Sequence, residues 1–339
     1  MKHVYLTMFL LLSLSSAANI AQPGIYRAGG GSGFTLLFPE DSTAFDKVRM
    51  ERELVSIQIY PGFAVVKGEY SLRNLSDSSL NFHLGYPVNH IIESDSRQRD
   101  MASVWFPQFY GLTVYQGAEQ QPVRLDSSLR YKAISRYDRL DWYVWETTFE
   151  PKEEQTILVY FLANTNEAVV LQEYDKNKDQ IFMYLLESGA VWNGPIGTGE
   201  IRLQGKDGII LSASQRMYTA LPAMFHPQSK SIVARFSALN PTPKHNFIIR
   251  GSEWTKPFDF ADILSSRDHL YEELDRFSFT ELPKELTESV EQQDPFVVTN
   301  HLTTWFMGLA MIAGVMAPYI LGGGLLLLIG YRLFKRMSS

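Results

Sequence analysis

The sequence predicts a mainly β protein: an antiparallel β-sandwich-like exported domain, a short helix with a stalk, and one C-terminal transmembrane helix. Two observations predict this fold class. Apolar and polar residues alternate in short runs between Gly, Pro and Asn turns over residues 54–250, which is typical of strands with one buried face. Residues 305–330 contain no charged side chain, as expected of a membrane span.

The first 18 residues predict a signal peptide. Residues 4–14 are apolar but too few to span a bilayer, and the small residues 15–18 follow them at once. We expect cleavage after Ala18, with Ala21 as the alternative position. An uncleaved N-terminal anchor is the other interpretation of the same pattern.

Residues 19–53 are expected to form a flexible N-terminal segment. It contains the run AGGGSG at residues 28–33, followed by the apolar run FTLLF. A glycine loop that cradles phosphate would need a Lys-Ser or Lys-Thr pair, or a strand before it and a helix after it. No lysine lies beside this run, so it is interpreted as a linker.

Residues 54–250 are expected to form the β-sandwich-like domain. Val55, Ile57 and Ile59 alternate with polar neighbours, and a Pro61-Gly62 turn follows them. Similar patterns predict further strands at 64–72, 80–84, 112–115, 142–149, 156–162, 168–171, 181–186, 200–203, 209–211, 232–236 and 247–249. Long helices do not alternate with these runs, which argues against a parallel α/β sheet.

Two short segments of this domain resemble exported bacterial domains of uncharacterised function. The first is a strand pair that ends in an Asn-x-Ser turn, at residues 65–76. The second is the pattern Gly-Ala-x-Trp-x-Gly-x-Ile, at residues 189–196. The likeness extends over about residues 54–250. The resemblance implies export and a β-rich fold, and it implies no established activity.

Residues 251–304 predict a helix followed by an acidic stalk. Phe260, Leu264 and Tyr271 belong to a set of apolar residues at helical spacing, and Asp259 precedes them where a carboxylate favours a helix N-terminus. An acidic stretch follows at residues 281–294. We expect this stretch to hold the β domain away from a membrane.

Residues 305–331 predict the transmembrane helix. The 26 uncharged residues would form a helix of about 39 Å, longer than the ~30 Å hydrocarbon layer. Trp305 and Tyr331 flank the run, and the basic tail at residues 332–339 follows it. Basic residues stay on the cytoplasmic side, so the β domain is expected in the periplasm or outside the cell. A buried helix of a soluble protein is the alternative.

Small residues recur along one face of this predicted helix. Ala310, Gly314, Pro318 and Gly322 are spaced four residues apart. Such spacing lets two transmembrane backbones approach closely, so Ala310, Gly314 and Gly322 are candidates for helix pairing. The alternative is that Gly and Pro are common in transmembrane helices.

One short segment is a candidate calcium site. Asp175, Asn177 and Asp179 carry oxygen ligands at alternating positions, which is a pattern that can surround Ca²⁺. An EF-hand loop would also need Gly and Glu where the chain has Gln180 and Leu186. A polar hairpin turn before the next strand accounts for the same residues, and no other cofactor is indicated.

Aromatic residues are dense in two segments. Trp105 and Tyr110 lie in residues 104–115, and Tyr143 and Trp145 lie in residues 136–146. Exposed rings of this kind can stack on sugars or contact a partner protein. The alternative is that these rings pack in the core. Strand alternation places Tyr143 and Trp145 on one face, opposite Trp142.

These features predict a binding or scaffold protein of the bacterial cell envelope that is not an enzyme. The chain has no cysteine, and its net charge of −6 gives no sign of a nucleic-acid surface. The expected partners are the membrane, a protein partner or a second copy bound through the transmembrane helix, and polysaccharide. A carbohydrate- or small-ligand-binding surface protein is one alternative, and an envelope enzyme with dispersed catalytic residues is the other.

Overall fold

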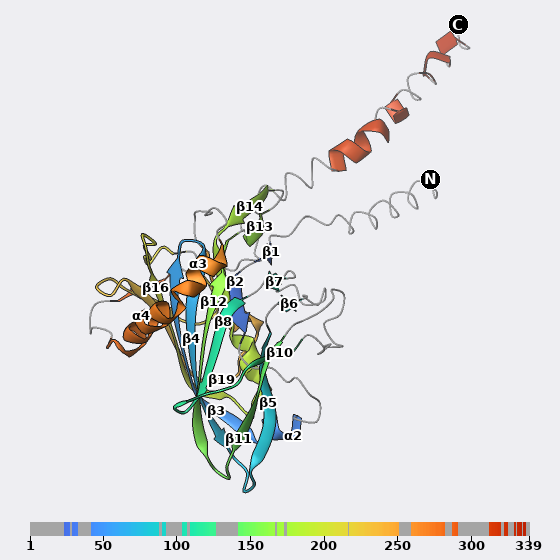
Figure 1. Ribbon diagram of the computed structural model, residues 1–339. Coiled ribbons are helices and arrows are strands. Elements are labelled where there is room, and N and C mark those ends of the chain that lie inside the picture. Colours follow the sequence, from blue (N-terminus) through green and yellow to red (C-terminus); the bar gives the residue numbers. More distant parts are fainter. Residues whose placement is uncertain are drawn as a thin grey trace. The chain divides into compact units, whose positions relative to one another are not determined.

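A computed structural model describes most of the chain (Figure 1). The described residues are 24–27, 29–32, 42–87, 90–92, 104–106, 109–126, 142–166, 168–172, 175–215, 217–250, 259–281, 287–290, 312–319, 322–324, 329, 331–333 and 335–336. The chain divides into two compact units, Met1–Phe296 and Val297–Ser339. The predicted signal peptide lies outside the described residues.

The first unit is built around a nine-stranded sheet. Its strand order is β21 (Glu288–Ser289), β18 (Ala223–His226), β19 (Ser231–Leu239), β16 (Ile196–Gly205), β3 (Val48–Tyr60), β4 (Phe63–Asn74), β12 (Glu154–Asn164), β8 (Phe109–Gln116) and β9 (Glu119–Gln120). Most neighbours are antiparallel, but β16 runs parallel to β3. The mainly β prediction is therefore confirmed, and the sheet is mixed where an antiparallel one was expected.

Three smaller sheets accompany it. One has the order β10 (Arg124–Asp126), β11 (Trp142–Phe149), β5 (Leu80–Pro87). The second is β17 (Met217–Tyr218), β20 (Phe247–Arg250), β15 (Ile181–Leu185), β2 (Gly29–Ser32). The third is β14 (Asp175–Asp179), β13 (Ala168–Gln172), β1 (Gly24–Arg27), β7 (Val104–Phe106), β6 (His90–Ile92). Where the structure describes this unit, its helices are α2 (Ser42–Phe45), α3 (Phe260–Ser265) and α4 (Arg267–Phe279), with 3₁₀ turns η3 (Leu186–Val191) and η4 (Pro243–His245).

The β3–β4 hairpin follows the predicted alternation. Its two-residue loop places Gly62 at φ 89°, a conformation that glycine adopts without strain. Val55, Ile57 and Ile59 all join one buried cluster, together with alternate residues of β4. The predicted buried face is therefore confirmed, and it is called the inner face below.

The inner face packs against the smaller sheets. Its cluster combines alternate residues of β3, β4, β12 and β16 with side chains of β5, β11, β15 and β20. Helix α2 contributes Phe45, whose ring stacks on Trp192 with centroids 4.8 Å apart. This arrangement places the main core between the nine-stranded sheet and the three- and four-stranded sheets.

The opposite, outer face is covered by α3 and α4 (Figure 1). A second buried cluster joins Phe63 and Leu162 of the sheet to Leu274 and Phe277 of α4. Asp259 begins α3 by accepting a hydrogen bond from the Ala261 amide at 2.9 Å. The predicted helix is thus present as two consecutive helices that cover the sheet.

One predicted strand is wrong, at residues 209–211. The chain turns back before it, with Asp207 and Gly208 both at positive φ. The Ile209 amide then donates to the Lys206 carbonyl at 3.0 Å. Residues 209–211 take no part in a sheet, although Leu211 is buried. Its burial explains the apolar pattern that predicted a strand.

Two segments expected outside the domain contribute edge strands to it. Within the expected linker, β2 runs parallel to β15. Within the expected stalk, β21 pairs with β18, and the Val290 amide donates to the Ala223 carbonyl at 3.0 Å. Val290 is buried in the inner cluster.

The described residues of the second unit are helical. Several of their apolar side chains are exposed, among them Ile312, Val315 and Tyr319. Where the structure describes the chain, no single helix combines the length and the apolar character needed to cross a membrane. Much of the predicted span, residues 305–331, lies outside the described residues, and the span stays a prediction.

Candidate functional site

A carboxyl group lies in the middle of the main core. Glu53 is on the inner face of β3, two residues before Val55, and its side chain is buried. Its neighbour on β4 is Tyr70, and its neighbour on β16 is Gly199, which has no side chain. A charged group in such a place is rare unless it is paired or hydrogen-bonded.

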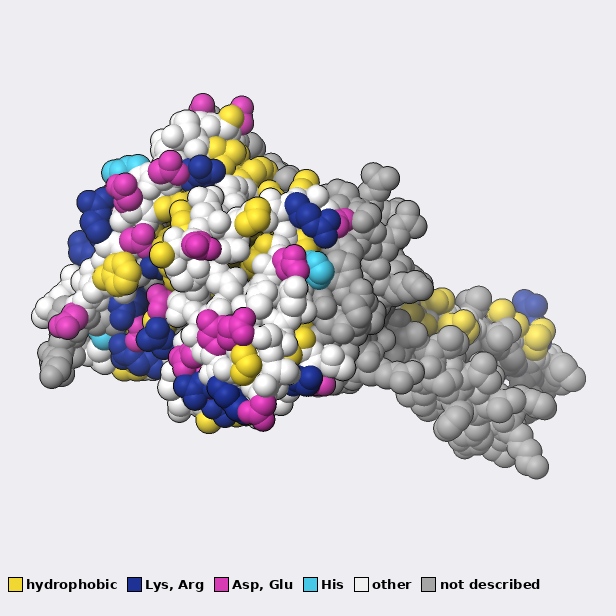
Figure 2. Space-filling model, turned by 60° about the horizontal axis from the view of Figure 1, so that its bottom comes forward, with side chains coloured by type: hydrophobic (Ala, Val, Ile, Leu, Met, Phe, Trp, Pro, Cys, Tyr) yellow, Lys and Arg dark blue, Asp and Glu magenta, His cyan; other side chains and the backbone are white. Residues whose placement is uncertain are grey.

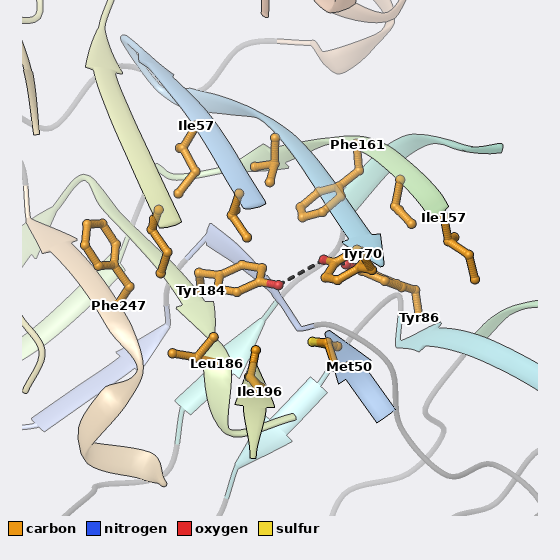
Figure 3. Close-up of a cluster of buried hydrophobic side chains, with 14 of the residues drawn as sticks. Met50, Ile57, Tyr70, Tyr86, Ile157, Phe161, Tyr184, Leu186, Ile196 and Phe247 are labelled. Carbon is orange, nitrogen blue, oxygen red and sulfur yellow. Dashed lines mark hydrogen bonds between the residues drawn. The ribbon is translucent and has the colours of Figure 1, made fainter. Parts of the chain in front are cut away.

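Three tyrosines link to this carboxyl in a chain of hydroxyl groups. The Tyr184 hydroxyl donates to Glu53 Oε1 at 2.7 Å. The Tyr70 hydroxyl lies 2.9 Å from that of Tyr184 and 2.6 Å from that of Tyr86. Figure 3 shows the hydroxyls of Tyr70 and Tyr184 pointing toward each other among apolar side chains such as Ile57. We call these four residues the buried tyrosine–glutamate chain.

The hydrogen bonds of this chain have one direction. Each phenol carries a single hydrogen, and Tyr184 uses its own for Glu53 Oε1. Tyr184 must therefore accept from Tyr70, and Tyr70 in turn accepts from Tyr86. Among the described residues, Glu53 Oε2 has no hydrogen-bond partner. This oxygen is consequently the place where a proton would reside.

Burial sets the acidity of the chain. Desolvation raises the pKa of Glu53 to about 7, and the hydrogen bond from Tyr184 opposes this rise. Desolvation also raises the pKa of each tyrosine, and the charge of a nearby ionised Glu53 adds to the rise. The tyrosines therefore stay neutral, and Glu53 is the member of the chain that titrates near neutral pH.

A glycine fixes the position of the central ring. A Cβ atom on Gly68 would lie 2.2 Å from the Tyr70 hydroxyl oxygen, far inside contact distance. Tyr70 thus lies against the bare backbone of its own strand. This contact positions its hydroxyl between those of Tyr86 and Tyr184.

A second polar cluster lies on the outer face. Lys67 of β4 is buried, and its Nζ lies 2.8 Å from Asp275 Oδ1 of α4. The Tyr160 hydroxyl donates to the same oxygen at 2.8 Å. Lys67 Nζ also lies 4.5 Å from the ring centroid of Phe279, within cation–π range. This cluster fastens α4 to the sheet.

The structure separates the aromatic residues that the sequence proposed for binding. Trp145 is only 2 % exposed, so its ring belongs to the core, which is the alternative that the sequence left open. Tyr143 is half-buried on the same face of β11. Tyr110 stacks on Phe260 of α3, with ring centroids 4.1 Å apart. Trp105 lies on β7, and its side chain is outside the described part of the chain.

Tyr143 connects the buried chain to the surface. It pairs across the three-stranded sheet with Tyr86 on β5 and with Leu125 on β10. Directly opposed residues share a face of a sheet. This row therefore runs from the buried Tyr86 through the half-buried Tyr143 to Leu125, which is 57 % exposed.

The other candidate residues remain untested. Asp175, Asn177 and Asp179 lie on β14, which pairs with β13, and their side chains are outside the described part of the chain. Among the residues that are described, no three His, Asp or Glu side chains gather closely enough to hold a metal ion. Gly314 and Gly322 lie in helical segments, and Ala310 lies outside the described residues. The calcium site and the helix-pairing face stay predictions.

Sequence reasoning did not identify the buried tyrosine–glutamate chain. One signal was present, because Glu53 continues the alternation of Val55, Ile57 and Ile59 and so falls on the inner face. The meeting of Tyr70, Tyr86 and Tyr184 depends on the packing of three sheets, which spacing along the sequence does not encode.

No protein family and no curated protein sequence matches this chain. Among solved structures, it is similar to a candidate nutrient binding protein from Legionella pneumophila, with a TM-score of 0.43 and 14% identity over 68% of this chain and 72% of that one. It is also similar to a mutant M1 zinc metallopeptidase from Deinococcus radiodurans bound to a Tyr-Ser-Ala substrate, with a TM-score of 0.32 and 9% identity. That match covers 60% of this chain and 42% of the peptidase. Neither likeness assigns an activity to this chain.

Proposed function

We propose that this chain is a membrane-anchored, extracytoplasmic binding or scaffold protein of the bacterial cell envelope, without enzymatic activity. The N-terminal pattern supports export, with a signal peptide over residues 1–18. The uncharged run at residues 305–330 and the basic tail after it support a single membrane span with the tail in the cytoplasm. The β-rich unit would then lie in the periplasm or outside the cell.

One observation carries the proposal of an anchor. The described parts of the second unit are helical, and within the predicted span Ile312, Val315, Tyr319, Ile329 and Tyr331 are all exposed. So many exposed apolar side chains indicate a surface that is shielded from water by another molecule. A lipid bilayer supplies such shielding for an uncharged helix.

The first unit has a different surface. On the face shown in Figure 2, apolar side chains are scattered between acidic, basic and neutral ones. Its exposed large apolar residues in the described ranges are Leu125, Ile210 and Phe279. Its buried acid and its buried lysine are engaged in internal hydrogen bonds and an ion pair. A role in binding fits this unit better than a reaction at either buried group.

A specific observation favours one alternative, a ligand-binding surface. Leu125 is exposed beside the half-buried ring of Tyr143. An aromatic ring next to an exposed aliphatic side chain can contact a sugar face or an apolar group of a partner. Tyr143 is accordingly retained as the candidate contact residue, whereas Trp145 is buried in the core.

Membrane fractionation tests the anchor. The full chain should stay with the membrane after alkaline extraction, and the chain ending at residue 304 should be released. Val315→Arg should weaken membrane retention, because an arginine at the centre of a span costs about 2.5–3.5 kcal/mol during insertion. Val315→Ile is the matched control and should behave like the unaltered chain. Release of the unaltered chain by alkaline extraction would contradict the anchor.

Crosslinking in the native membrane tests the binding role. A discrete partner, or retention on envelope polysaccharide, should be lost in Leu125→Asp and in Tyr143→Ala. Ile210→Asp is the control, because it places the same charge at an exposed residue elsewhere on the unit. Equal binding by all three variants would exclude the Leu125–Tyr143 surface, and the absence of any partner or ligand would contradict the binding role.

Self-association through the span is a separate part of the proposal. Replacing Gly314 and Gly322 by Ile should lower dimer formation in a membrane, because the larger side chains hold the backbones apart. Energy transfer between labelled copies would measure it. An unchanged signal would remove the helix-pairing face from the proposal without affecting the anchor.

A further inference from the structure

The buried tyrosine–glutamate chain joins three sheets. Glu53 and Tyr70 belong to the nine-stranded sheet, Tyr184 belongs to the four-stranded sheet, and Tyr86 belongs to the three-stranded sheet. Their hydroxyl and carboxyl groups meet in the main core, where the surrounding side chains are apolar (Figure 3). Three hydrogen bonds of 2.6–2.9 Å thus connect elements that otherwise pack through apolar contacts.

We propose that these four residues form a proton-binding site, and that the proton on Glu53 controls how tightly the three sheets pack together. Among the residues that the structure describes, the groups that face Glu53 are the phenols of Tyr184, Tyr70 and Tyr86, and the opposed residue on β16 is Gly199. All of these groups are neutral. A carboxylate at this position would therefore be buried among them, with no counter-charge from the described part of the chain.

The physical consequence follows from the cost of an unpaired buried charge. A neutral carboxyl satisfies Tyr184 through Oε1 and carries its proton on Oε2. An ionised carboxyl loses the solvation that water gave it, and one hydrogen bond from Tyr184 replaces only part of it. Water entry between the sheets is the means by which the core can relieve this cost. Ionisation of Glu53 should therefore loosen the contact between the nine-stranded sheet and the smaller sheets.

The direction of the pH effect can be stated. Burial raises the pKa of Glu53 from 4.5 to about 7 in the folded chain. Because the folded state holds this proton more tightly than the unfolded state, the stabilisation is complete below pH 4.5 and is lost as the pH rises through about 7. The tight state is the acidic one.

Hydrogen–deuterium exchange of the full chain in detergent micelles tests the proposal. After correction for the intrinsic effect of pH, peptides from β3, β4, β5 and β15 should exchange faster at about pH 8 than at about pH 5.5. Glu53→Gln should remove this difference, because glutamine is neutral at both values. Glu69→Gln makes the same chemical change on the outer face of β4 and should keep the difference. A difference that survives in Glu53→Gln, or one that is absent from the unaltered chain, would overturn the proposal.

Infrared titration provides a second test if Glu53→Gln does not fold. The band of a protonated buried carboxyl should disappear as the pH rises through about 7. Glu187 is the other carboxyl in the described ranges with a raised pKa, and Glu187→Gln in the background removes its contribution to the band. Tyr184→Phe should move the midpoint to higher pH, because the hydrogen bond from Tyr184 lowers the pKa of Glu53. A midpoint that Tyr184→Phe leaves in place would overturn the proposal.

Discussion

Glu53 and Lys67 lie on neighbouring strands of the same sheet, but on opposite faces. Glu53 is buried on the inner face, and its hydrogen-bond donor is a neutral phenol. Lys67 is buried on the outer face, and a carboxylate lies 2.8 Å from its ammonium group. Protonation therefore keeps Glu53 neutral in the core, whereas Lys67 stays charged and is paired with a carboxylate.

The difference reflects how far each face is from water. The inner face is sealed between sheets, so a counter-ion there would itself have to be buried. The outer face is covered by α3 and α4, and the side chain of Asp275 on α4 remains 37% exposed. A carboxylate at that position keeps part of its hydration while it neutralises Lys67. The elements that pack against a face of the sheet therefore decide whether a buried ionisable group is neutralised by a proton or by an opposite charge.

Removal of the outer counter-charge should give the largest effect. Asp275→Asn leaves the Lys67 ammonium buried without a carboxylate. We expect a loss of about 2–3 kcal/mol in the free energy of unfolding, below the full cost for a buried pair because Asp275 is partly exposed. Urea denaturation would measure it. Lys67→Met removes the charge that needs compensation and should cost less, and an equal or larger loss in Lys67→Met would contradict this account.

Disruption of the inner face should come next. Gly68→Ala places a methyl group against the Tyr70 ring, and overpacking of this kind costs about 2 kcal/mol. Thermal unfolding would measure the loss. In a Tyr70→Leu background the same substitution should cost clearly less, because the ring that the methyl group meets is absent. An unchanged cost in that background would show that Tyr70 is not the reason for the glycine.

The attachment of α3 gives a smaller effect. Tyr110 and Phe260 stack with ring centroids 4.1 Å apart, which joins β8 to the helix. A double-mutant cycle with Tyr110→Leu and Phe260→Leu should give a coupling energy of about 1 kcal/mol in chemical denaturation. A coupling near zero would mean that the rings contact each other without contributing to the attachment.

The two faces should respond to pH in opposite directions, which is the most subtle of these effects. On the outer face, burial by itself would raise the pKa of Glu273 on α4. The hydrogen bond from Tyr60 and the charge of Lys206 outweigh burial, so the pKa of Glu273 is lowered. Its contribution is therefore present above the ordinary value of 4.5 and is lost as the pH falls through the lowered pKa. Amide exchange in α4 should rise at low pH, where the inner face is tightest.

Glu273→Gln should remove part of this rise. Glu272→Gln, at the exposed neighbouring position, is the matched control and should leave it unchanged. A rise in α4 exchange that is the same in both variants would assign the low-pH effect to another group.

Local sequence patterns predicted much of the nine-stranded sheet. The alternation of Val55, Ile57 and Ile59 identified the inner face, and the apolar spacing after Asp259 identified the helical region. Such patterns report one buried face at a time. They did not predict the parallel contact of β16 with β3, because their pairing depends on residues about 150 positions apart.

The candidate site was less accessible to prediction. The alternation of strand β4 places Lys67 among the residues that would be exposed. Its burial depends on helix α4, which begins about 200 residues later in the chain. Tyr143 and Trp145 were correctly placed on one face, but the sequence did not decide whether that face was exposed. The structure resolves this because β5 and β11 turn that face toward the core.

Strand β21 also determines where mechanical load would enter the β-rich unit. It pairs with β18 at two residue positions, and Val290 is the last described residue of the first unit. Along the described chain, a pull applied at Val290 acts on β21 before it acts on α4 or the central strands. So short a pairing would detach early and withdraw Val290 from the core, while the long β3–β4 hairpin stayed paired. Under such a load, β21 is expected to be the first of the two to separate.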